Sequence, residues 1–199
     1  MIAKPANTAE PIAEIIAARW SGRAYDASRA VSEAQITALC EAARWAPSCF
    51  GDEPWRFIIW DRFHDAESWQ KAFDCLVEGN QAWAKNAPVL ILAASVEHFS
   101  HNDKPNRWTG YDTGAASVSL CLQATQLGLM SHQMGGFDSN AMRETFAIPE
   151  SVHLWSMNAI GYALPLEALG AEQREKELSP RKRRPLEQQF FHGGWQQSR

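Results

Sequence analysis

The spacing of apolar residues along the chain predicts two helices in its first quarter. One is expected from Thr8 to about Gly22, where apolar side chains recur at helical intervals at Ile12, Ile15, Ile16 and Trp20. Another is expected from Ser32 to just before Pro47, because Ser32 and Gln35 form the S-x-x-Q pattern of a capping box. The proline then ends this helix and starts a loop that reaches residue 54.

Strand patterns follow this loop. Residues 55–60 are β-branched and aromatic, and residues 88–95 form an apolar run typical of a strand buried on both faces. A further strand is predicted over residues 152–164, with a bulge at Gly161. Shorter helical segments are expected at 65–77, at 81–86, after a cap at Ser139, and at 166–178.

Residues 112–129 are almost all apolar or small, which predicts a buried helix. Small residues such as Gly114 and Ala115 let another backbone approach closely, and this suits either a central core helix or the axis of a dimer. The polar stretch 97–110 before it is predicted to be a long loop of the kind that covers a site.

Composition narrows the class of protein. A chain of 199 residues without linkers or repeats is expected to form a single domain, 1–199, and its mixture of elements without regular βαβ alternation favours an α+β fold. The net charge of −4 argues against a general nucleic-acid binder. No apolar run approaches a membrane span, and the cysteines, Cys40, Cys49, Cys75 and Cys121, are scattered. We therefore expect a cytoplasmic protein without a membrane segment.

Motif searches exclude several enzyme classes. The chain has no G-x-G-x-x-G, P-loop, H-E-x-x-H or G-x-S-x-G pattern, which disfavours Rossmann dehydrogenases, P-loop NTPases, zincins and α/β-hydrolases. His98 and His101 lack an obvious third metal ligand nearby, so no metal site is predicted.

Cationic and turn-rich segments remain as candidates for chemistry. Arg19 and Arg23 flank Ser21 and suit a phosphate, or they complement a helix end. The basic run 181–184 is either an anion clamp or a solvated tail. The proline-bounded loop 46–57 can hold a planar polar partner or serve as a helix-to-strand turn, and Gly135-Gly136 offers open backbone amides or a plain loop.

Taken together and in order, these segments resemble the nitroreductase family of FMN-dependent oxidoreductases. The family's R-x-S-x-R-x-[FY] motif matches residues 19–25, and A-P-S-x-x-N-x-Q-P-W matches residues 46–55 in part. Later matches are A-P-x-x-I at 87–91, D-x-G-A-A at 112–116, an L-G-L segment before the glycine pair, and R-x-R-x-P-L-E at 181–187. The resemblance covers residues 19–187.

The resemblance implies an α+β sandwich in which helices flank a mixed, mostly antiparallel sheet. It also implies an intertwined homodimer with FMN at the interface. The tail from about 179 to 199, with Phe190, Phe191 and Trp195, would then reach the partner subunit. The implied activity is a ping-pong transfer of hydride from NADH or NADPH through the flavin to a small acceptor such as a nitroaromatic or a quinone. Alternatives are reductive dehalogenation or flavin cleavage on the same fold, a non-catalytic flavin-binding protein and, from the basic run, weak nucleic-acid binding.

Site roles follow from the same resemblance. Arg19, Ser21 and Arg183 are expected to hold the FMN phosphate with Arg181 nearby, and Arg23 to reach the ribityl chain or the pyrimidine edge. The partner's loop would line the isoalloxazine with Pro47, Ser48 and Cys49, and Gly135 and Gly136 would present an amide to N(5). No dedicated acid–base residue is implied. The aromatic candidates for the substrate slot are Phe99, Trp108 and Phe137.

The chain departs from the family pattern in the loop, where Gly51 replaces the usual Asn and Glu53 the usual Gln. A carboxylate accepts hydrogen bonds but does not donate them, so Glu53 can accept from flavin N(3) without donating to a carbonyl oxygen. We hypothesise that Glu53 makes the flavin harder to reduce.

Overall fold

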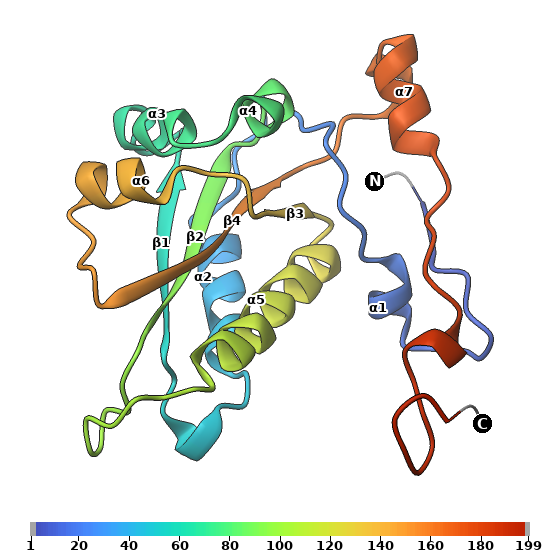
Figure 1. Cartoon of the computed structure of the whole chain (residues 1–199). Coiled ribbons are helices and arrows are strands. Elements are labelled where there is room, and N and C mark those ends of the chain that lie inside the picture. The colour runs from blue at the N-terminus through green and yellow to red at the C-terminus, as the bar shows by residue number, and fades with distance from the viewer. Residues whose placement is uncertain (1–2, 198–199) are drawn as a thin grey trace.

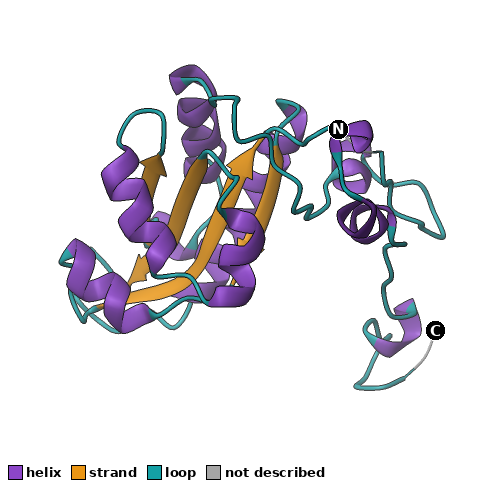
Figure 2. Cartoon of the chain, turned by 90° about the horizontal axis from the view of Figure 1, so that it is seen from above, coloured by secondary structure: helices purple, strands orange, loops and turns teal. Residues whose placement is uncertain are grey.

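A four-stranded antiparallel sheet forms the centre of the computed structural model, which describes residues 3–197 (Figure 1). The strands are β1 (Trp55–Asp61), β2 (Val89–Val96), β3 (Met130–Met134) and β4 (Val152–Gly161), in the spatial order β1-β2-β4-β3. With helices on both sides of the sheet, the predicted α+β class is confirmed (Figure 2).

Two apolar clusters lie on opposite faces of this sheet. The helices α2 (Glu33–Arg44) and α5 (Thr109–Gln126) pack on one face with Val89 and Ile91. On the other face, Leu90 and Leu92 pack with the helices α3 (Ala66–Asp74), α4 (Glu78–Ala84) and α6 (Ser139–Phe146). Alternate residues of β2 therefore enter different clusters, which is why seven of its eight residues are apolar, with Ser95 as the exception.

Several predicted elements have different boundaries. The capping box of Ser32 and Gln35 is present, but the expected first helix is reduced to α1 (Glu14–Ala18). Ile12 and Ile16 are exposed, so the apolar stripe that suggested a longer helix has no core to bury it in this chain. At α6 the cap is Asp138 rather than Ser139, because the Asp138 carboxylate accepts the hydrogen bonds from the backbone amides of Asn140 and Ala141.

The bulge in β4 lies at Trp155, not at Gly161. The register with β2 shifts between Ala93 and Ala94, so Trp155 is the extra residue on β4. Gly161 instead allows a close approach, because a Cβ there would lie 2.4 Å from Cδ of Pro88 and 3.2 Å from the Tyr25 ring. The sequence signal at this glycine therefore reflects packing rather than strand irregularity.

Gly161→Ala is expected to destabilise the protein by about 1–3 kcal/mol, because the rigid Pro88 ring cannot move aside and β4 must shift. Gly170→Ala is the matched control, since a Cβ there meets no atom within 4 Å. Urea unfolding of both variants measures the difference. Equal midpoints would show that β4 accommodates the methyl group without strain.

Helix α5 is buried on one side only. Thr113, Ala116 and Leu120 face the core, whereas Tyr111 and Val118 are 78% and 48% exposed. The predicted fully buried helix is therefore wrong for the isolated chain. An apolar row on its outer face is left without a covering element among residues 3–197.

The two ends of the chain pair to form an arm beside the sheet domain (Figures 1 and 2). The arm contains α1, α7 (Ala171–Leu178) and the following tail, with short 3-10 turns at Leu166–Ala168 and Leu186–Gln188. The tail runs away from the sheet, and its Phe190 and Trp195 are largely exposed. The final two residues of the predicted tail, 198–199, lie outside the described residues. No helix within residues 3–197 has the length and hydropathy that crossing a bilayer requires.

Candidate functional site

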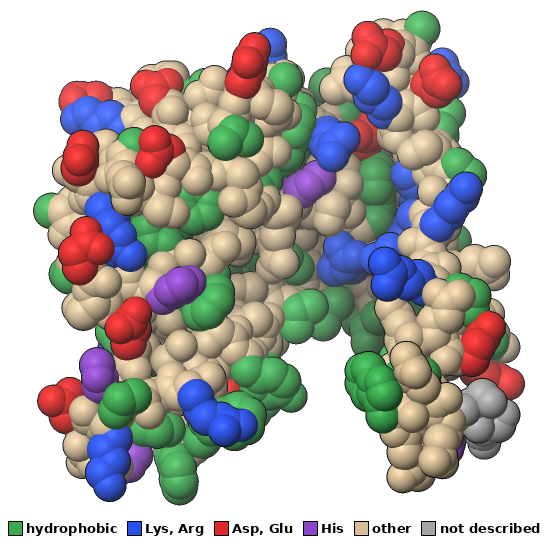
Figure 3. Space-filling model, viewed as in Figure 1, with side chains coloured by type: hydrophobic (Ala, Val, Ile, Leu, Met, Phe, Trp, Pro, Cys, Tyr) green, Lys and Arg blue, Asp and Glu red, His purple; other side chains and the backbone are tan. Residues whose placement is uncertain are grey.

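Arginines from opposite ends of the chain line one pocket where the arm meets the sheet domain. The pocket has a volume of about 300 Å³ and is lined by Lys4, Arg19, Trp20, Ser21, Arg23, Lys176, Glu177, Ser179, Pro180, Arg181 and Arg183. Lysine and arginine side chains gather in this region of the surface (Figure 3). The structure thus brings together all five residues that the sequence assigned to the phosphate and ribityl region, although the chain is acidic overall.

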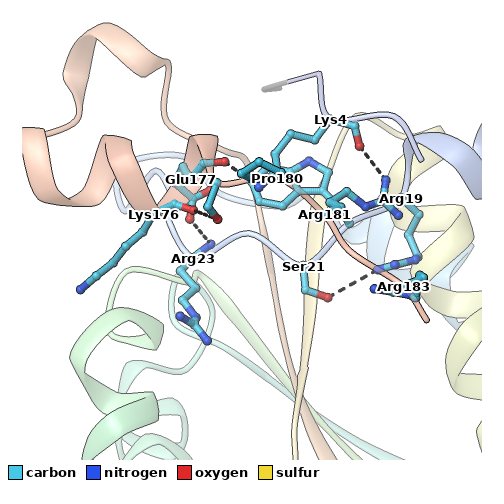
Figure 4. A pocket seen from close by; sticks show the side chains of 11 residues that line it. Lys4, Arg19, Ser21, Arg23, Lys176, Glu177, Pro180, Arg181 and Arg183 are labelled. Carbon is cyan, nitrogen blue, oxygen red and sulfur yellow. Dashed lines mark hydrogen bonds between the residues drawn. The ribbon is translucent and has the colours of Figure 1, made fainter. Parts of the chain in front are cut away.

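Hydrogen bonds fix the cationic side of this pocket. Arg181 donates from Nη1 to the backbone carbonyls of Lys4 at 2.6 Å and Ala17 at 2.7 Å, which ties the tail to the N-terminal segment. Arg19 donates to Oγ of Ser21 at 3.4 Å (Figure 4). Desolvation, followed by repulsion from Arg19 and Arg183, lowers the pKa of Arg181. Such an arrangement of like charges favours a bound anion.

Sequence reasoning missed Glu177, a carboxylate in the same pocket. It lies near the end of α7, a helix with an otherwise charged and exposed sequence, yet it is 3% exposed. Its Oε1 accepts the backbone N–H of Arg23 at 2.8 Å, and its carbonyl accepts a bond from Nζ of Lys4. No local pattern distinguishes this glutamate from its neighbours, because the arm packing alone buries it.

A second cavity of about 340 Å³ shares Arg19 and Ser21 with the first. Its other lining residues are Val118 and Cys121 of α5 and Ser131 and Gln133 of β3, none of which the sequence analysis selected. The pKa of the Cys121 thiol is raised, chiefly by burial. Alternation along β3 is the signal that could have identified Ser131 and Gln133, because it places both on the α5 side of the sheet.

Arg23 points away from the other arginines (Figure 4). Its guanidinium lies 5.9 Å from the ring of Trp83, which also packs at 4.5 Å against His132 of β3. Nδ1 of His132 lies 3.0 Å from the carbonyl oxygen of Gly22, and desolvation lowers the pKa of this histidine. Arg23 is therefore displaced toward the α4 side of the pocket, away from the Arg19 side.

The glycine pair follows β3 directly. The Gly136 carbonyl accepts bonds from Nδ2 of Asn80 at 2.9 Å and from the amide of Val77 at 3.2 Å. A Cβ on Gly136 would lie under 3 Å from both side chains, so the turn requires glycine there. A Cβ on Gly135, in contrast, would meet nothing within 4 Å, so its backbone is open to a ligand.

The loop of residues 47–53 is located at the other end of α5. The backbone amide of Cys49 donates to Oδ2 of Asp112 at 3.0 Å, and Oγ of Ser48 accepts the amide of Glu53 at 3.0 Å. Asp112 lies in the first turn of α5, about 13 Å along the helix from Cys121, since each residue rises about 1.5 Å. One chain alone therefore does not bring Pro47, Ser48, Cys49 and Glu53 to the arginine pocket.

The predicted substrate aromatics do not form one group. Phe99 packs near Phe50 at 5.7 Å and His101 at 5.3 Å, beside the 47–53 loop, and Trp108 is 40% exposed at the start of α5. Phe137 instead packs against the apolar core. Phe50 was not selected from the sequence, although it is 82% exposed and has a left-handed backbone with φ of 57°. Within residues 3–197, no three His, Cys, Asp or Glu residues are grouped so that they could hold a metal ion.

Comparisons with known proteins place this geometry in a family. The family model described as "Nitroreductase family" matches residues 16–162. A curated protein of Archaeoglobus fulgidus is 27% identical over 158 residues, which cover 77% of this chain and 86% of that protein. It bears the provisional name NADH dehydrogenase/NAD(P)H nitroreductase.

Two further relatives extend the comparison. A Mycolicibacterium smegmatis protein known only as a 15.4 kDa protein is 32% identical over 124 residues, covering 60% of this chain and 80% of its own. A crystal structure described as an oxidoreductase containing FMN has a TM-score of 0.87 and 35% identity, covering 95% of each chain. This chain therefore belongs to the nitroreductase family.

Proposed function

We propose that this protein is an FMN-dependent oxidoreductase that takes hydride from NADH or NADPH and passes it to a small acceptor such as a nitroaromatic or a quinone. The observation that carries the proposal is the convergence of Arg19 and Ser21 with Arg183 in one pocket. The similar crystal structure that contains FMN supports the choice of flavin.

The residues that line the two cavities suit the successive parts of FMN, from the phosphate to the ring. The guanidinium groups of Arg19 and Arg183 and the hydroxyl of Ser21 suit a phosphate. From there the β3 strand, about 15 Å long at about 3.3 Å per residue, leads to the open backbone of Gly135. A ribityl chain and a tricyclic ring can span that path, with Gln133 along it and Arg23 toward α4.

The site is completed by a second copy of the chain in this proposal. The 47–53 loop lies too far along α5 to reach the pocket of its own chain. The outer row of α5 and the exposed aromatic side chains around it, Phe50, Trp108, Tyr111 and Trp155, form an apolar surface typical of an interface. A homodimer through this surface would bring the partner subunit's loop against the flavin ring.

When bound, FMN supplies the hydride-accepting and hydride-donating chemistry. The chain holds the cofactor through its phosphate, orients the ring between backbone surfaces, and leaves one face open for reductant and acceptor in turn. The described residues that line the two cavities provide cations and hydroxyls for binding, and the proposal assigns none of them as an acid–base catalyst.

Anaerobic reduction of the purified protein tests the proposal. A yellow protein that releases FMN on denaturation should be bleached by NADH or NADPH, and a quinone or nitroaromatic should restore its colour. A yellow protein that neither nucleotide bleaches would favour a non-catalytic flavin carrier. A protein that binds no FMN would refute the proposal.

Glu53→Gln is expected to raise the midpoint potential of the bound flavin. Glu53 is exposed, with a left-handed backbone that turns the loop back toward Ser48. Its negative charge near the ring would oppose the charge gained on reduction, and glutamine removes that charge while adding a donor. Spectroelectrochemistry measures the potential, and Glu41→Gln on the surface of α2 serves as control. An unchanged potential would contradict the role assigned to Glu53.

A further inference from the structure

Glu177 is the one carboxylate among the described residues that line the arginine pocket. One hydrogen bond fixes its carboxylate. Oε1 accepts the amide of Arg23 at 2.8 Å, whereas Oε2 is buried without a hydrogen-bond partner. A Cβ on Gly22 would lie 2.9 Å from Oε2, so the chain leaves room for this oxygen by having glycine at that position.

The surroundings of Glu177 are mostly cationic. Lys4 of the N-terminal segment and Arg23 act on it electrostatically, and Arg19, Lys176, Arg181 and Arg183 line the same pocket. Tyr25 is buried nearby, and His132 lies against the Gly22 carbonyl. When ionised, Glu177 is a counter-ion for Lys4 and Arg23.

A phosphate that enters the pocket changes the electrostatic environment of Glu177. It brings up to two negative charges into the pocket that Glu177 lines, while Oε2 has no hydrogen bond to compensate its own charge. Burial already raises the pKa of Glu177, against the opposing effects of the Arg23 amide and of Lys4. Each added negative charge disfavours the ionised carboxylate further.

We propose that Glu177 takes up a proton from solvent when a phosphate monoester binds in this pocket, so that binding of the phosphate is coupled to protonation of this carboxyl group. The inference rests on the proposed FMN function and adds a residue and a proton to its binding step. The proton goes to Oε2, and no other bond forms or breaks. Glu177 thereby makes cofactor retention pH-dependent and, when ionised, lowers the preference for FMN over riboflavin.

The coupling makes the affinity for the phosphate depend on pH. Above the pKa of Glu177 in the free protein, binding requires either proton uptake or repulsion between two anions, so affinity for the phosphate falls as pH rises. Glu177→Gln resembles the protonated group, because its amide oxygen still accepts the Arg23 amide bond. The variant should therefore bind FMN more tightly than the native chain at high pH, and the two affinities should converge at low pH.

Titration of the apoprotein with FMN and with riboflavin over a range of pH tests the proposal. We expect Glu177→Gln to bind FMN about tenfold more tightly at high pH, equivalent to a pKa change of about one unit, with no gain for riboflavin, which lacks the phosphate. Glu175→Gln, an exposed carboxylate on the same helix, is the control and should match the native chain. Because the phosphate's own ionisation is common to all variants, it cancels in the comparison.

Calorimetry of the native protein gives a second readout that needs no variant. Binding of FMN in buffers with different ionisation enthalpies should show net proton uptake, and binding of riboflavin should show none. FMN binding without proton uptake, and with the same pH profile in Glu177→Gln, would overturn this inference and leave the proposed function intact. Failure of FMN to bind at any pH would overturn both.

Discussion

Replacing Arg19 with alanine is expected to weaken FMN binding by about ten- to a hundredfold while leaving riboflavin binding nearly unchanged. A hydrogen bond to a charged group contributes about 1.5–3 kcal/mol, which corresponds to that range. Arg19 lies in both cavities and contacts Ser21, so its loss removes a charge and releases the hydroxyl from its position. Arg183→Ala should act in the same direction from the other end of the chain.

Fluorescence titration of the flavin against apoprotein measures both affinities. Arg44→Ala removes the same charge from the exposed surface of α2, where the arginine pairs with Glu41 and lies 5.3 Å from the Trp45 ring, and should leave both affinities unchanged. The double variant of Arg19 and Arg183 should lose less than the sum of the single losses, because both groups contact one ligand. Equal losses for FMN and riboflavin would mean that Arg19 supports the fold rather than the phosphate.

Val118→Glu is expected to make the protein monomeric and unable to retain FMN. In the isolated chain, Val118 is 48% exposed, so a glutamate would cost little. In the proposed dimer the row of Tyr111, Gly114 and Val118 is buried between two copies of α5. An unpaired charge there costs several kcal/mol, and the dimer dissociation constant should rise by at least about a hundredfold.

Sedimentation velocity combined with the visible spectrum measures assembly and flavin together. Phe63→Glu is the control, because it places the same charge on another exposed hydrophobic residue, in the turn after β1 at the opposite edge of the sheet. That variant should stay dimeric and yellow. A Val118→Glu protein that remains a flavin-bound dimer would show that the interface uses another surface.

Local sequence signals predict three of the four strands and the start of α2, whereas β3 was not assigned as a strand. The run at β2 is apolar at all positions but Ser95 because both of its faces are covered, and the capping box at Ser32 fixes the start of α2. The first helix is shorter than its apolar spacing predicts, since Ile12 and Ile16 find no buried surface in this chain. Spacing indicates which residues share a face but not whether anything covers that face.

The site residues also fall into those that were predicted from the sequence and those that depend on tertiary packing. The family resemblance assigned Arg19, Ser21 and Arg183 to one phosphate site, and these three residues line one pocket. Glu177, Ser131 and Gln133 were missed because their position depends on the packing of the arm and of β3 against α5. A loop was predicted from Pro47 to Pro54, but its distance from the pocket follows from the length of α5, which separates Asp112 from Cys121.

The pairing of the two chain ends also constrains how the protein is made. Arg181 follows the last strand of the sheet along the chain, and it bonds to carbonyls of residues that precede the first strand. During translation the sheet and its helices can form before the arginine pocket exists, because Arg181 and Arg183 leave the ribosome after β4. Under the proposed function, FMN can occupy this pocket only after the segment that follows β4 has joined the arm.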